Sequence, residues 1–102
     1  MNFGLDDKTI GLVKGVFLKY PEVESVTLYG SRATGKFTQG SDIDLTIKGT
    51  SIDISVLSRI SSELDDLLIP YTFDLSSFSD IDNPDLPNHI KSFGIIFYKK
   101  GE

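Results

Sequence analysis

The chain has 102 residues, 39% of them hydrophobic, with no cysteine and a formal net charge of −5 at pH 7. This length and apolar content predict a single folded domain over residues 1–102, and the lack of cysteine excludes disulfides and thiol chemistry. The acidic balance argues against direct nucleic-acid binding, which needs many Lys and Arg side chains on one face, but it is compatible with a nucleotide bound through metal ions.

Helix and strand patterns alternate in the first half of the sequence. Apolar residues at three- and four-residue spacing and an N-cap at Asp6 predict the first helix, which Pro21 ends. Gly30 and Ser31 stop the strand that follows. The elements expected here are a helix over residues 6–20, a strand over 25–29, a short helical turn through Arg32 and Ala33, a loop over 35–40 and a strand over 41–47.

The second half begins with a turn in which Ser51 is the expected N-cap of an amphipathic helix. Pro70 precedes a third strand, and Asn88 is the expected N-cap of a short helix. The elements expected here are a helix over residues 52–68, a strand over 71–75, an acidic loop over 78–87, a helix over 88–93 and a short apolar end over 95–98. This order predicts an α/β (α+β) fold: a small mixed β-sheet with helices packed on one face and the other face open.

Acidic side chains recur on the polar side of two predicted strands. Residues two apart on a strand point to the same face, so Asp42 and Asp44 share the face opposite Ile43. Asp74 has the same arrangement in the third strand. If these strands are neighbours, three carboxylates gather on one side of the sheet, and their mutual repulsion requires a cation. Oxygen ligands with open geometry suit Mg²⁺.

The Gly-Ser pair at the end of the first strand fits a phosphate-binding turn. Gly30 allows close backbone approach, the following N–H groups attract anions, Ser31 adds a hydroxyl and Arg32 a positive charge. Taken singly, the turn, the Asp-x-Asp and Asp74 each fit an ordinary turn or a solvated strand face better than a site. Their combination is more specific, because paired carboxylates can bridge two Mg²⁺ ions that bind a nucleoside triphosphate and activate an acceptor hydroxyl.

The segment GSRATGKFTQGSDIDLTI resembles the signature of nucleotidyltransferases of the polymerase-β superfamily. It is most similar to the minimal nucleotidyltransferase (MNT) family, which includes antitoxins of the MntA type. In that family a Gly-Ser pair precedes Asp-x-Asp, and a third acid lies on a later strand; the matching residues here are Gly30, Ser31, Asp42, Asp44 and Asp74. The ending NHIKSFGIIFY is similar to the family's last helix and strand, so the resemblance covers nearly the whole chain. Family members often carry a basic residue where this chain has Thr34.

The resemblance implies a nucleotidyltransferase-like fold and transfer of AMP from ATP to a hydroxyl, with two Mg²⁺ ions as cofactors. The residues expected to act are the catalytic and metal-binding Asp42, Asp44 and Asp74, and the nucleotide- or phosphate-binding Gly30, Ser31, Arg32 and Ser41. It further implies a partner with a HEPN (higher eukaryotes and prokaryotes nucleotide-binding) ribonuclease domain, a toxin that AMP on a tyrosine would silence.

Two alternatives stay open for the function. One is a non-catalytic binding module that neutralises a partner by contact alone. The other is nucleotidylation of an antibiotic, although enzymes of that kind usually have an added substrate domain.

The remaining features favour structural roles. His89, the single histidine, is expected to be exposed and structural, and the acidic run at Asp80, Asp82 and Asp85 is expected to be a solvated loop. The N-terminal sequence lacks a signal-peptide pattern, and no stretch is apolar enough to cross a membrane. We therefore expect a soluble, cytoplasmic protein.

Overall fold

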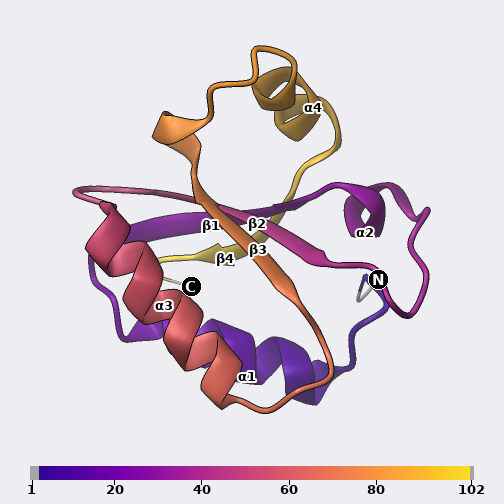
Figure 1. The fold of residues 1–102 in the computed structure, drawn as a ribbon, viewed down its shortest axis with the longest axis horizontal. Helices are drawn as coiled ribbons and strands as arrows, with labels where there is room; N and C mark the ends of the chain where they lie inside the picture. Colours follow the sequence, from indigo (N-terminus) through magenta and orange to yellow (C-terminus); the bar gives the residue numbers. More distant parts are fainter. Residues whose placement is uncertain (1–2, 102) are drawn as a thin grey trace.

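A four-stranded mixed β-sheet organises residues 3–101, the part of the chain that this computed structural model describes. The strands are β1 (Val23–Tyr29), β2 (Ile43–Gly49), β3 (Phe73–Ser77) and β4 (Ile95–Lys99), in the spatial order β3-β2-β1-β4 (Figure 1). β1 pairs antiparallel with β2 and β4, whereas β3 runs parallel to β2. The predicted mixed sheet and fold class are confirmed.

The helices lie on both sides of this sheet. They are α1 (Asp7–Leu18), α2 (Ser31–Thr34), α3 (Ile54–Asp66), the 3₁₀-helix η1 (Phe78–Asp80) and α4 (Leu86–Phe93). Figure 1 shows α1 and α3 below the sheet and α4 above it. The polar face is therefore not left open as expected. The reason is that α4 buries Ile90 and packs against β1, while Gly94 brings the chain close to Thr27 of that strand.

Side-chain capping explains where the longer helices begin. Asp6 Oδ1 accepts a hydrogen bond from Thr9 N at 2.7 Å, so the predicted N-cap of α1 is confirmed. For α3 the predicted N-cap was wrong: Asp53 Oδ1 accepts from Val56 N at 2.9 Å, and Ser51 lies two residues earlier with φ +58°. The last helix starts before the predicted Asn88, inside the expected loop over residues 78–87, which also contains η1.

Two strand boundaries differ from the prediction in a way that matters for the acids. β2 begins at Ile43, so Asp42 directly precedes the strand, and β3 covers Phe73–Ser77 instead of residues 71–75. The predicted alternation nevertheless holds within the strands. The side chains of Ile43 and Leu45 are fully buried in the core, and Asp44 between them points to the opposite face.

The main core lies between the sheet and the helices α1 and α3. Its buried side chains include Val13, Val16 and Phe17 of α1, Val26 and Leu28 of β1, Ile43, Leu45 and Ile47 of β2, and Val56, Ile60 and Leu64 of α3. Because strand residues alternate between faces, a register shift of one residue would move every acid of β2 and β3 into this core. The apolar alternation thus determines which face carries the carboxylates. Within residues 3–101 no helix is long and apolar enough to span a membrane.

Candidate active site

The acids of β2 and β3 meet on the polar face of the sheet, as the sequence predicts. In the parallel register Asp44 pairs with Asp74, and on its other side Asp44 pairs with Tyr29 of β1. One step along, Ser76 Oγ donates a hydrogen bond to Thr46 Oγ1 at 3.2 Å. Asp44 is half-buried, whereas Asp74 on the edge strand is exposed.

The surroundings of Asp44 disfavour the ionised form of its carboxyl group. Burial raises its pKa above the ordinary value, and the negative charges of Asp74 and Asp42 raise it further. Within residues 3–101 the one salt bridge joins Lys19 to Glu63, which belong to α1's C-terminal end and α3. No described cationic side chain therefore forms an ion pair with the carboxylates on the polar face.

The acids provide the right ligand chemistry for Mg²⁺ but not a complete ligand set. Among residues 3–101 no three Asp, Glu, His or Cys side chains are grouped closely enough to hold a metal ion. Asp44 and Asp74 are cross-strand neighbours, and Asp42 is an exposed residue just before β2. Because Mg²⁺ in nucleotide sites commonly binds one or two carboxylates together with substrate phosphates and water, the Asp44–Asp74 pair fits this ion.

The Gly-Ser turn abuts the same carboxylates. Gly30 has φ +76° and ψ −153°, a conformation essentially restricted to glycine. A Cβ at this position would overlap Asp44 Oδ2, so the glycine is required both by its backbone and by its contact with Asp44. Ser31 follows as the first residue of α2 and is half-buried. The turn and the acid pair therefore form one site.

Arg32 is a structural residue rather than an exposed phosphate ligand. Its side chain is 1% exposed, and its guanidinium donates from Nη2 to Ser41 O at 3.0 Å and from Nη1 to Phe3 O at 2.9 Å. The group also lies 5.2 Å from the ring centre of Phe37 and 5.3 Å from that of Tyr71. Arg32 thus connects α2 to the residue before Asp42 and to the segment that leads into β3.

Ser41 has a similar local role. Its Oγ accepts a hydrogen bond from Thr38 N at 2.9 Å and closes the loop before β2, while its carbonyl oxygen accepts from Arg32. Arg32 and Ser41, both expected to bind phosphate, therefore hold in place the loop that leads to Asp42. The sequence contains no local signal for this, because the partners of Arg32 lie on three separate segments.

We expect Arg32→Met to destabilise the protein by about 2 kcal/mol, because it leaves the part-buried carbonyl oxygens of Phe3 and Ser41 without their charged donor. Urea unfolding followed by circular dichroism measures the change. Lys36→Met is the matched control, since Lys36 lies four residues away, is exposed, and loses the same charge. Equal stability of the two variants would contradict a structural role for Arg32.

A cavity of about 730 Å³ opens beside the Gly-Ser turn. Its lining consists of Gly30, Ser31, Ala33, Thr34, Lys36, His89 and Phe93. This volume lies within the range of about 300–1,000 Å³ that is usual for small-molecule sites. His89, which the sequence analysis assigned to an exposed structural role, is half-buried here, and its Nε2 accepts a hydrogen bond from Gly30 N at 3.2 Å.

A second opening flanks the acids on the other side. It has a volume of about 400 Å³, runs between α3 and the edge strand β3, and includes Ile54, Leu57, Phe73 and Asp74 in its lining. Asp74 therefore borders this groove, while Gly30 borders the cavity described above, and Asp44 stands between Asp74 and the turn.

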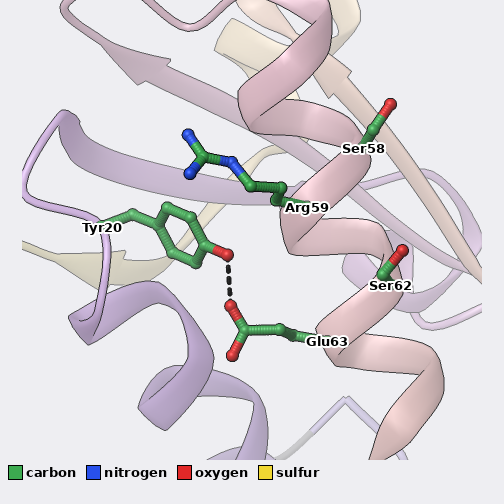
Figure 2. Close-up of a pocket in the computed structure, with 5 residues that line it drawn as sticks. All are labelled: Tyr20, Ser58, Arg59, Ser62 and Glu63. Atoms are coloured by element: carbon green, nitrogen blue, oxygen red, sulfur yellow. Dashed lines mark hydrogen bonds between the residues drawn. The ribbon is translucent and has the colours of Figure 1, made fainter.

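A further cavity, of about 370 Å³, lies away from the acids against α3, and Figure 2 shows its lining. The Tyr20 hydroxyl donates to Glu63 there, and Lys19 Nζ contacts the same carboxylate at 2.8 Å. These hydrogen bonds lower the pKa of Glu63. The arrangement ties the end of α1 to α3 and includes none of the candidate site residues.

Sequence and structure comparisons agree on the class of this fold. The family model described as polymerase beta, nucleotidyltransferase, matches residues 12–102. No curated protein sequence matches the chain.

Several solved toxin–antitoxin structures contain a chain with the same fold. A chain from a toxin–antitoxin crystallised with AMP-PNP is 18% identical, with a TM-score of 0.71 over 95% of this chain and 76% of that one. A chain from the MntA–HepT toxin–antitoxin is 14% identical, with a TM-score of 0.68 over 93% and 74%. A chain from the complex of a tri-AMPylated Shewanella oneidensis HEPN toxin with its MNT antitoxin is 16% identical, with a TM-score of 0.60 over 89% and 73%. At these identities the likeness is one of fold.

Proposed function

The chain belongs to the polymerase β nucleotidyltransferase family, and we propose that it transfers AMP from ATP to a hydroxyl of a partner protein, a tyrosine of a HEPN-domain toxin. The observation that carries this proposal is the meeting of the Gly30–Ser31 turn with the Asp44–Asp74 pair on one face of the sheet. Structures of the same fold include a toxin–antitoxin with AMP-PNP and an MNT antitoxin complexed with a tri-AMPylated HEPN toxin, which supports this choice of nucleotide and acceptor.

In the proposed reaction the acceptor oxygen attacks the α-phosphorus of ATP. A new phosphate ester forms, the bond between the α-phosphorus and the bridging oxygen to the β-phosphate breaks, and pyrophosphate leaves. Asp74 takes the hydroxyl proton, because its exposed carboxylate borders the groove between α3 and β3 where an acceptor can approach. Gly30 and Ser31 hold the departing phosphates on the side of the larger cavity.

The carboxylates of Asp42, Asp44 and Asp74 are proposed to hold Mg²⁺ together with the phosphates of ATP and water, because within residues 3–101 the acids alone are not grouped closely enough to bind the ion. When bound, this ion neutralises phosphate charge and activates the acceptor hydroxyl. Asp44 lies on β2, which is paired on both sides, whereas Asp42 lies directly after the loop that Ser41 closes. Arg32 and Ser41 contribute by keeping that loop in place.

We expect Asp74→Asn to lower AMP transfer by about a hundredfold or more, because an amide cannot accept the acceptor proton. The chain is mixed with a HEPN-domain protein, Mg²⁺ and α-labelled ATP, and label on the partner is measured by gel and mass spectrometry. Nucleotide binding, measured by calorimetry, should fall less in Asp74→Asn than in Asp42→Asn.

Asp80→Asn is the control, because Asp80 is an exposed acid of η1 outside the paired strands and the change removes the same charge. If no label reaches the partner, and Asp74→Asn still neutralises it as well as the parent does, the transferase proposal fails. That result would favour a binding module that acts by contact alone.

A further inference from the structure

The Gly30 backbone is held by a residue that lies 59 positions away in the sequence. His89 Nε2 accepts a hydrogen bond from Gly30 N at 3.2 Å, and on its other side Gly30 packs against the Asp44 carboxylate. Nε2 can accept only when it carries no proton, so this contact requires the neutral imidazole with its proton on Nδ1. Gly30 is therefore held from two directions.

The turn needs such support because its local hydrogen bonds, such as Ala33 N to Gly30 O at 3.2 Å, go to carbonyl oxygens and leave the Gly30 N–H to a distant partner. Gly30 occupies a sparsely populated backbone region, which persists only where the surroundings enforce it. The helix that follows, α2, has four residues and is too short to be stable by itself. Its first N–H groups also lack a side-chain cap. The conformation of the turn therefore depends on contacts from other elements.

His89 is itself firmly placed. Its backbone N donates to Asp85 O at 3.1 Å in the first turn of α4, and the next residue, Ile90, is 5% exposed. The imidazole stands nearly perpendicular to the Tyr29 ring, at 79° and 6.4 Å between centres, and lies 5.2 Å from the Phe93 ring. Because α4 packs on the polar face, it fixes where the His89 imidazole meets the Gly30 N–H.

We infer that His89 is a positioning residue: through its hydrogen bond to Gly30 N–H it holds the Gly30–Ser31 turn in the conformation that receives the triphosphate. The expected effect on AMP transfer rests on the proposed function. The expected effect on the Gly30 amide does not, because the hydrogen bond exists in the nucleotide-free chain.

The test compares His89→Leu, which removes the acceptor, with His89→Gln, whose side-chain oxygen reaches a position similar to that of Nε2. In the nucleotide-free protein, hydrogen exchange of the Gly30 amide should accelerate about two- to tenfold in His89→Leu and change little in His89→Gln, as expected for loss of one hydrogen bond. In transfer assays with the HEPN partner, KM for ATP should rise by a similar factor in His89→Leu with kcat little changed, and His89→Gln should restore it.

Unchanged Gly30 exchange in His89→Leu would overturn the inference, whether or not transfer is observed. If both variants raise KM equally while exchange in His89→Gln stays normal, the imidazole acts on the phosphate directly and the positioning role is also overturned. If Gly30 exchange accelerates in His89→Leu as expected but the parent protein transfers no AMP, the result counts against the proposed function alone. Melting temperatures of both variants verify that α4 remains packed.

Discussion

Replacing Asp44 by Asn is expected to reduce AMP transfer to below detection while raising the melting temperature of the metal-free protein. Transfer is lost because Asp44 touches the turn, pairs with Asp74 and is held inside the sheet. Stability rises because the folded chain pushes the pKa of Asp44 upward, through burial first and then the charges of Asp74 and Asp42. A neutral amide of the same shape removes this unfavourable charge.

The sign of the stability effect depends on pH. The pKa of Asp44 is higher in the folded chain than in the unfolded chain, so ionisation of this carboxyl costs stability. That cost is fully present above the folded-state pKa and is lost as the pH falls through it toward the unfolded-state value. The melting-temperature advantage of Asp44→Asn should therefore be clear at pH 7 and shrink in acid.

Asp42→Asn is the matched comparison for both effects. Asp42 precedes β2 and is exposed, so its replacement should also impair Mg²⁺-dependent ATP binding but leave the melting temperature nearly unchanged. Calorimetry that finds unchanged Mg²⁺-dependent ATP affinity in both variants would remove the proposed metal site. A melting temperature that falls in Asp44→Asn would show that the carboxylate has a stabilising partner.

The acid pair was predictable because the same alternation of apolar and polar residues orients the side chains of both strands. Alternation of apolar and polar residues identified the faces of both strands, and burial of Ile43 and Leu45 then leaves Asp44 on the polar side. The proximity of Asp44 and Asp74 required one further assumption, that the two strands are neighbours, and the parallel pairing of β2 and β3 confirms it. A local sequence pattern is sufficient to place a side chain when the residues next to it determine the face of the strand on which it lies.

Arg32 and His89 show where local pattern is insufficient. Arg32 follows the Gly-Ser pair, which favoured an exposed phosphate ligand, yet its donors bind carbonyl oxygens from residues outside that segment. His89 has no motif around it, and its contact with Gly30 arises only when α4 packs onto β1. Whether a side chain reaches solvent or another segment depends on tertiary packing, which residue spacing along the chain does not encode.

Gly30→Ala is expected to lower Mg²⁺-dependent ATP binding more than tenfold and to destabilise the fold by about 1–3 kcal/mol, the usual cost of enforcing a forbidden backbone region. Gly35→Ala provides a matched control at the other end of α2. Both glycines have positive φ, +76° and +82°, but a Cβ at Gly35 meets no atom within 4 Å, whereas one at Gly30 overlaps Asp44 Oδ2.

The comparison therefore separates backbone strain from displacement of the catalytic acid. Gly35→Ala should lose some stability and retain ATP binding, because an alanine in the left-handed region is strained but contacts nothing. Gly30→Ala adds a steric conflict that can be relieved only by moving the turn or the Asp44 carboxylate, and either movement separates the phosphate turn from the acid pair. Urea unfolding and calorimetry with Mg²⁺ and ATP measure the two losses independently. Equal ATP affinity in both variants would mean that contact between Gly30 and Asp44 has no part in nucleotide binding.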